Sequence, residues 1–218
     1  MSNLKQMMRD IEVELEYTCS MIGKSTFDKR VMEVMSTVPR HEFIPSGVRA
    51  YAYTNGPVQI GYGQTISQPY IVALMTDLLE PEPEDIILEV GTGSGYQAAI
   101  LSQLVTKVYS MEIIESLSER ATPLLHRYGY DNVDSRVGDG YYGWPEHAPF
   151  DGIIVTAAAP SIPQPLVEQL RPEAKLVIPV GMPYYHQELI VVEKDAQGNV
   201  STRDVLGVAF VPLTGDHN

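Results

Sequence analysis

The feature that most constrains this chain is the glycine-rich stretch Leu88–Tyr96, which reads LEVGTGSGY. It closes a short apolar run, 85–87, that is typical of a buried strand, and it precedes Ala98–Leu101, where a helical pattern begins. Glycines let a backbone turn tightly and approach a ligand closely, and the first turn of a helix offers free N–H groups. The stretch therefore predicts a βα corner that binds a ligand.

Two acids and the glycine spacing narrow the identity of that ligand. The spacing is G-x-G-x-G and not the G-x-G-x-x-G of dinucleotide sites, and a carboxylate at Glu89 would repel a pyrophosphate but suit a cationic group. A second predicted strand, 107–112, ends in Glu112, about 20 residues beyond the loop, where a carboxylate binds ribose hydroxyls. One acid for an amino or sulfonium group and one for a ribose indicate S-adenosyl-L-methionine. The alternative is a tight turn beside two surface carboxylates.

Charge and composition exclude several classes of protein. The chain has 218 residues and a formal net charge of −13, which opposes binding to nucleic acid because phosphate contacts need a basic surface. Cys19 is the only cysteine, so an internal disulfide is impossible and a reducing compartment is expected. We find no signal peptide and no run of about 18 apolar residues, so we expect a cytoplasmic protein without a membrane partner. No metal site is expected, because no metal-binding spacing links the histidines: His41, His126, His147, His186 and His217.

The order of predicted elements indicates an α/β fold with a doubly wound, mostly parallel sheet. Two amphipathic helices (4–21 and 27–38) and an aromatic, glycine-rich loop (51–63) come first, followed by a helix that begins near Pro69. Strands then alternate with helices, at 86–90, 107–112, 133–137, 150–156 and 176–180. The tail predicts an antiparallel hairpin, with strands 188–193 and 205–211 around a turn at 197–199.

We expect these elements to form a single domain over residues 1–218. It would consist of an N-terminal helical appendage with its loop (1–60), a cofactor-binding α/β core (61–181) and a C-terminal β-hairpin (182–218). In such a sheet the ligand crevice lies beyond the carboxyl ends of the strands. The chemically informative residues Glu89, Gly91, Glu112, Asp139 and Thr156 all fall at predicted strand ends, which predicts one site there.

Several separate stretches between about Val31 and Thr214 carry a resemblance to a known family. The most specific is QTISQP at 64–69, whereas the glycine loop occurs in many methyltransferases. The other stretches are 38–40 with Phe43, 138–140, 156–160, 179–181 and 210–214. The sequence resembles the protein-L-isoaspartate (D-aspartate) O-methyltransferases, class I S-adenosylmethionine-dependent enzymes with a Rossmann-like fold. The first 25 or so residues match no pattern of this family.

The resemblance implies a protein repair reaction. Such enzymes transfer a methyl group from S-adenosyl-L-methionine to the free α-carboxylate of L-isoaspartyl and D-aspartyl residues in damaged proteins and peptides, and they release S-adenosyl-L-homocysteine. The ester collapses to a succinimide, which reopens partly to normal aspartate. Because a carboxylate is already ionised near pH 7, the enzyme needs no strong general base and must chiefly position the reactants.

The resemblance makes Ser67 the catalytic serine, with a hydroxyl that orients the substrate carboxylate. The residue pattern also fits Ser67 as the N-cap of the following helix, with Pro69 in the first turn, and the two roles can coexist.

The resemblance also implies contacts to the cofactor and to the substrate. The cofactor contacts are Gly61, Tyr62, Gly63, Gln64, Glu89, Gly91, Thr92, Gly93, Gly95, Glu112, Ile113, Asp139, Gly140 and Thr214. The substrate contacts are Thr65, Ile66, Thr156, Ala157, Ala158 and Val180. The pattern alone leaves simpler explanations open: a surface acid at Glu112, a turn at Asp139–Gly140 and a strand-end hydroxyl at Thr214.

Other functions stay open at this level. A related enzyme could methylate an ordinary aspartate of a dedicated precursor peptide. A nicotinamide-dependent oxidoreductase is opposed by Glu89 and the glycine spacing, and a binding module without activity is opposed by the joint presence of Ser67, Glu89 and Glu112. We expect a monomer that acts on damaged proteins and peptides.

Overall fold

The computed structural model describes residues 3–182 and 185–216. Its helices are α1 (Asn3–Ile22), α2 (Lys29–Thr37), α3 (Pro69–Leu79), α4 (Tyr96–Ser102), α5 (Glu115–Arg127) and α6 (Gln164–Glu168). Its 3₁₀ helices are η1 (Arg40–Phe43), η2 (Ser46–Tyr51), η3 (Gly140–Tyr142) and η4 (Pro145–His147). Its strands are β1 (Val58–Gly61), β2 (Gln64–Ile66), β3 (Ile86–Val90), β4 (Lys107–Glu112), β5 (Val133–Val137), β6 (Phe150–Val155), β7 (Leu170–Gly181), β8 (Gln187–Lys194) and β9 (Val200–Val208).

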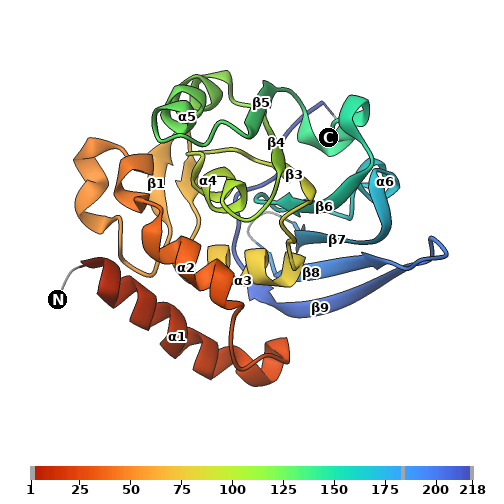
Figure 1. Ribbon diagram of the computed structural model, residues 1–218, viewed down its shortest axis with the longest axis horizontal. Helices are drawn as coiled ribbons and strands as arrows, with labels where there is room; N and C mark the ends of the chain where they lie inside the picture. The colour runs from red at the N-terminus through yellow and green to blue at the C-terminus, as the bar shows by residue number, and fades with distance from the viewer. Residues whose placement is uncertain (1–2, 183–184, 217–218) are drawn as a thin grey trace.

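A mostly parallel sheet forms the centre of the molecule, in the order β5-β4-β3-β6-β7-β8-β9 (Figure 1). The strands from β5 to β7 run parallel, whereas β8 is antiparallel to β7 and β9 is antiparallel to β8. The chain leaves β3 toward β4 and β5, and later continues on the other side of β3 with β6 and β7. The strand order therefore reverses beside β3, where ligands bind in sheets of this kind. The predicted doubly wound sheet and C-terminal hairpin are confirmed.

Helices cover both faces of this sheet, as a parallel sheet requires. Ile87 and Leu88 point to opposite faces because successive side chains of a strand alternate. The face of Ile87 packs against buried side chains from α1 to α5. The face of Leu88 packs against α6 and the segment that contains η3 and η4. Both faces of the central strands β3 and β6 are thereby removed from water, whereas the edge strands β5 and β9 stay largely exposed.

The N-terminal helices are part of this packing. In α1, Met7, Ile11 and Leu15 recur every four residues and are buried, so the helix presents one apolar stripe to its neighbours α2 and α3 (Figure 1). Helix α1 is part of the core, because its buried residues belong to the same hydrophobic cluster as those of α3 and β3.

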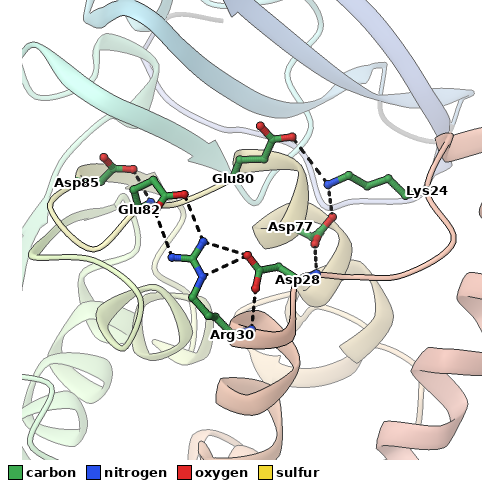
Figure 2. A network of polar contacts seen from close by, with 7 residues as sticks. All are labelled: Lys24, Asp28, Arg30, Asp77, Glu80, Glu82 and Asp85. Carbon is green, nitrogen blue, oxygen red and sulfur yellow. Dashed lines mark hydrogen bonds and ion pairs between the residues drawn. The ribbon is translucent and has the colours of Figure 1, made fainter.

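A polar network fixes the connection between α1 and α2 (Figure 2). Asp77, at the end of α3 and only 2% exposed, accepts hydrogen bonds from Lys24 Nζ at 2.6 Å and from the backbone N of Asp28 at 2.6 Å. Arg30 in turn contacts the Asp28 carboxylate at 2.9 Å and Glu82 at 3.3 Å. These bonds anchor the start of α2 to the carboxyl end of α3.

The structure corrects several predicted boundaries. The loop expected at 51–63 contains the end of η2 and strand β1, which pairs with β2 in an antiparallel hairpin; β1 is only four residues long and ends at a glycine, so its signal is weak. Strand β7 begins at Leu170, six residues before the predicted start. The last strand covers Val200–Val208 and not 205–211. No helix within the described ranges has the length and apolar character needed to cross a membrane.

Candidate active site

A cavity lies at the carboxyl ends of β3, β4 and β6, where the strand order reverses, with an empty volume of about 770 Å³. Its wall contains these predicted site residues: Gln64, Thr65, Ile66, Ser67, Gly91, Thr92, Gly93, Glu112, Ile113, Gly140, Thr156, Ala157 and Thr214. The structure therefore brings together segments that are up to 150 residues apart in sequence (64 to 214). The cavity lies where ligands bind in sheets of this kind.

The glycine loop follows β3 closely and is tied to the neighbouring strands. Gly91 has φ +100°, and a Cβ there would overlap the Thr156 hydroxyl, so only glycine fits. The Thr156 hydroxyl donates to Gly91 O at 2.7 Å, and Gly91 N donates to Met111 O at 2.8 Å. The loop backbone is thus held between β4 and β6 before any ligand binds.

Glu112, at the end of β4, is held by backbone groups on both sides. It is 5% exposed, and its two carboxylate oxygens accept from Gly93 N at 2.7 Å and Ile114 N at 2.9 Å. Hydrogen bonds to a carboxylate from fixed N–H groups orient it. Since Glu112 also lines the cavity, it presents an oriented acceptor to a ligand.

Glu89 lies behind the loop and not on the cavity wall. It is fully buried, and it accepts a hydrogen bond from the Ser110 hydroxyl, which itself lies 2.5 Å from the Thr92 hydroxyl. Desolvation raises the pKa of Glu89 to about 8; the nearby Glu112 adds to the rise, whereas the Ser110 hydrogen bond opposes it. Near pH 7 Glu89 is therefore mainly neutral, and any influence on a ligand acts through the loop.

A second cavity, with an empty volume of about 1360 Å³, adjoins the first. It is lined by α1, by the segment before α3 and by residues 206–211 at the end of β9 and just after it. The two cavities share four wall residues: Thr65, Ser67, Thr156 and Val211. Ser67 therefore lies where the cavities meet.

The backbone of Ser67 is fixed by a buried arginine. Arg40, in η1, is completely buried and donates from Nη2 to Ser67 O at 2.7 Å and from Nε to Ala52 O at 2.8 Å. Its guanidinium also lies over the ring of Tyr96, 4.9 Å from the centroid. Burial lowers the pKa of Arg40 to about 10, so the group stays charged at pH 7.

The predicted N-cap role of Ser67 is wrong. Gln68 occupies the N-cap position of α3 without a side-chain capping bond, because its amide is directed to Glu14. Within the described residues the Ser67 hydroxyl forms no hydrogen bond, which leaves it available to a ligand.

Some predicted site residues lie away from both cavities. The tip of the β1–β2 hairpin points outward, with Tyr62 60% exposed under the Arg120 guanidinium. Gly95 packs against α5, and the Asp139 carboxylate accepts from backbone N–H groups of Tyr141 and Asp216. The predicted residues absent from both walls are Gly61, Tyr62, Gly63, Glu89, Gly95, Asp139, Ala158 and Val180.

Other residues on the first wall were not predicted from the sequence. They are Val72, Val90, Ser94, Tyr96, Gln97, Met111, Ile114, Val211, Pro212 and Leu213. Most are apolar neighbours of the motif residues, so adjacency to a motif was the available signal. No three His, Cys, Asp or Glu side chains in the described parts of the chain are grouped to hold a metal ion; His217 lies outside those parts, and the absence of a metal stays a prediction.

Comparison with known proteins assigns the family. The family model for protein-L-isoaspartate(D-aspartate) O-methyltransferase matches residues 19–218. The chain belongs to this family. It is accordingly an S-adenosyl-L-methionine-dependent methyltransferase that acts on proteins.

Individual relatives agree with this assignment. The chain is 62% identical to a protein-L-isoaspartate O-methyltransferase 2 of Syntrophobacter fumaroxidans over 212 residues, which covers 97% of this chain and 86% of the relative. It is 60% identical to the protein of the same name from Nitrosococcus oceani, over 100% of this chain and 99% of the relative. A Plasmodium falciparum protein assigned to the same activity, solved in complex with S-adenosyl-L-homocysteine, aligns with TM-score 0.79 and 25% identity over 98% of this chain and 99% of that chain.

Proposed function

We propose that this chain repairs damaged proteins by methylating the free α-carboxylate of L-isoaspartyl residues, with the cofactor in the first cavity and the peptide in the second. One observation carries the proposal: the two cavities meet at Ser67, so two ligands bound in them would face each other there. A methyl transfer between two bound molecules requires such a junction.

The residues of the first cavity fit S-adenosyl-L-methionine, which supplies the methyl group. The oriented carboxylate of Glu112 would accept from the ribose hydroxyls. The backbone at Gly91 and Gly93 would lie against the methionyl part, since neither residue has a side chain that would keep a ligand at a distance. Gly140, Ile113 and Thr214 would complete the wall.

Ser67 would act on the substrate and not on the cofactor. Its hydroxyl would donate to the substrate carboxylate and aim it at the methyl group, while Arg40 holds the Ser67 backbone through its carbonyl. Orientation and exclusion of water supply up to about 7–11 kcal/mol when reacting atoms are well aligned. The Thr156 hydroxyl is committed to the glycine loop, so Thr156 would contribute to the substrate site chiefly through its methyl group.

The names of the relatives favour isoaspartyl repair over methylation of an ordinary aspartate in a dedicated precursor peptide. We further propose that the enzyme acts in the cytoplasm, in keeping with its single cysteine, which rules out an internal disulfide. We also propose that it acts as a monomer.

Transfer of labelled methyl groups to a matched peptide pair tests the proposed function. We expect label on an isoaspartyl peptide and none on its aspartyl twin. The Ser67→Ala variant should lower kcat by about 10- to 100-fold, because a hydrogen bond to a charged group is worth about 1.5–3 kcal/mol. Its affinity for S-adenosyl-L-homocysteine should equal that of the wild type, and Ser201→Ala, a change at an exposed serine that lines neither cavity, serves as control. Label on both peptides would refute isoaspartyl repair, and full activity of Ser67→Ala would refute the role of Ser67.

A further inference from the structure

Helix α1 lies largely outside the region that the family model matches, yet it forms part of the second cavity. The match begins at residue 19, whereas α1 begins at Asn3. Glu14, Thr18 and Met21 of α1 line the cavity. They recur at helical spacing and lie beside the stripe of buried residues that packs into the core. The helix therefore has a surface directed at the proposed peptide site.

One oxygen of Glu14 connects two segments that flank Ser67. Glu14 Oε2 accepts from Gln68 Nε2 at 2.7 Å and from Asn55 Nδ2 at 2.6 Å. Asn55 Oδ1 in turn accepts from the backbone N of Tyr70 at 3.1 Å, in the first turn of α3. Through one direct and one relayed contact, Glu14 holds both residue 68 and residue 70.

These contacts replace the cap that α3 lacks. Gln68 is the N-cap residue of α3 but makes no side-chain capping bond, and Asn55 satisfies a backbone N–H of the first turn instead. Hydrogen bonds from amides to a carboxylate are stronger than those between neutral groups. A negative charge near the start of a helix is also favourable. The segment after Ser67 is therefore tied to α1 by interactions 41 and 54 residues apart in sequence.

We propose that Glu14 is a positioning residue for methyl transfer: it fixes the segment 67–70 from the side of α1, so that the Ser67 hydroxyl faces the junction of the two cavities. Arg40 fixes the same segment through the Ser67 carbonyl. The inference rests on the proposed function of Ser67. It assigns α1 to the substrate side of the active site.

Kinetics of Glu14 variants on an isoaspartyl peptide test the inference. In Glu14→Ala we expect kcat/KM for the peptide to fall about 10-fold, with the dissociation constant for S-adenosyl-L-homocysteine within twofold of the wild type. Glu14→Gln keeps an oxygen that accepts from both amides and should recover most of the activity. Glu12→Ala, an exposed acid on the same helix, should behave as the wild type. Wild-type kinetics of Glu14→Ala, equal losses in the Ala and Gln variants, or a parallel loss of cofactor affinity would each overturn the proposal.

A double-mutant cycle separates this inference from the proposed function. If Glu14 acts through Ser67, the loss in the Glu14→Ala, Ser67→Ala double variant should be clearly smaller than the product of the two single losses. Fully multiplicative losses, with Ser67→Ala impaired as expected, would overturn the role of Glu14 and leave that of Ser67 intact. A fully active Ser67→Ala would instead refute the proposed role of Ser67, and with it the inference.

Discussion

Two walls of the joined cavities each have a fully buried ionisable group behind them: the glycine loop with Glu112, which we propose as the cofactor wall, and the segment 67–70, which we propose as the substrate wall. Near pH 7 one of the two groups is neutral and the other stays charged. Glu89, behind the glycine loop, has a pKa raised to about 8 and relieves the cost of burial by keeping a proton. Arg40, behind Ser67, has a pKa lowered only to about 10 and stays charged at pH 7. Each has one atom, Glu89 Oε1 and Arg40 Nη1, without a hydrogen-bond partner among the described residues.

The different protonation of Glu89 and Arg40 explains what surrounds each group. A buried acid can become neutral, so the cofactor wall needs little beyond the local backbone and the Ser110 hydroxyl. A buried guanidinium stays charged, so the surroundings of Arg40 provide two backbone carbonyls and the ring of Tyr96, which itself lines the first cavity. The segment 67–70 is therefore held by side chains from outside the sheet, Arg40 and Glu14, whereas the glycine loop is held by groups at the ends of the adjacent strands β4 and β6.

Removing the buried guanidinium should have the largest effect on stability. Arg40→Met leaves the carbonyls of Ala52 and Ser67 without their donor, and each buried unsatisfied group costs about 1–3 kcal/mol. We expect the free energy of unfolding to fall by about 4 kcal/mol, measured by urea denaturation near pH 7. Arg49→Met, a change at an exposed arginine, provides the control. A loss below about 0.5 kcal/mol, the level of an ordinary surface substitution, would contradict the importance of this anchor.

A cavity-facing acid of the cofactor wall should show the next largest effect, and on binding. Glu112→Ala removes the oriented carboxylate that we assign to the ribose, and it leaves Gly93 N and Ile114 N without their acceptor. We expect the affinity for S-adenosyl-L-homocysteine to fall about 100-fold, which equals about 2.7 kcal/mol, by isothermal titration calorimetry. Exposed Glu115→Ala should bind as the wild type does. Unchanged affinity in Glu112→Ala would place the ribose elsewhere.

The same difference explains what the sequence could predict. The cofactor wall consists of a contiguous glycine motif and residues at strand ends, and alternation of strands and helices places such ends together. Gly91, Gly93 and Glu112 therefore reach one cavity as predicted from the strand order. Whether each contacts the cofactor stays a prediction.

The substrate wall was less accessible to sequence reasoning because its contacts are long-range and carried by side chains. Arg40 reaches a carbonyl 27 residues away, and Glu14 reaches Gln68 over 54 residues. Neither spacing forms a local pattern, so the sequence did not link Arg40 to Ser67, and the residue pattern around Ser67 also fitted a helix N-cap. Gln68 occupies the N-cap position and its amide binds Glu14, a contact that no local rule reveals. The β1–β2 hairpin was not predicted because its two strands are short and are separated by glycines, which gives little alternation to recognise.

The smallest effect should be that of neutralising the buried acid, and it should depend on pH. Because folding raises the pKa of Glu89 from 4.5 to about 8, the folded state holds a proton that the unfolded state releases between these values. Stability from this group is therefore complete below pH 4.5 and is lost as the pH rises toward 8, by up to about 1.4 kcal/mol for each pH unit. Glu89→Gln cannot ionise, so its stability should lack this dependence on pH. The free energy of unfolding of the variant should therefore rise relative to that of the wild type when the pH is raised from 6 to 7. Urea denaturation at the two pH values measures the gain, with Glu84→Gln, an exposed acid, as control. A difference between Glu89→Gln and wild type that stays constant with pH would mean that Glu89 is ionised in the folded protein, and the two walls would then bury charge in the same way.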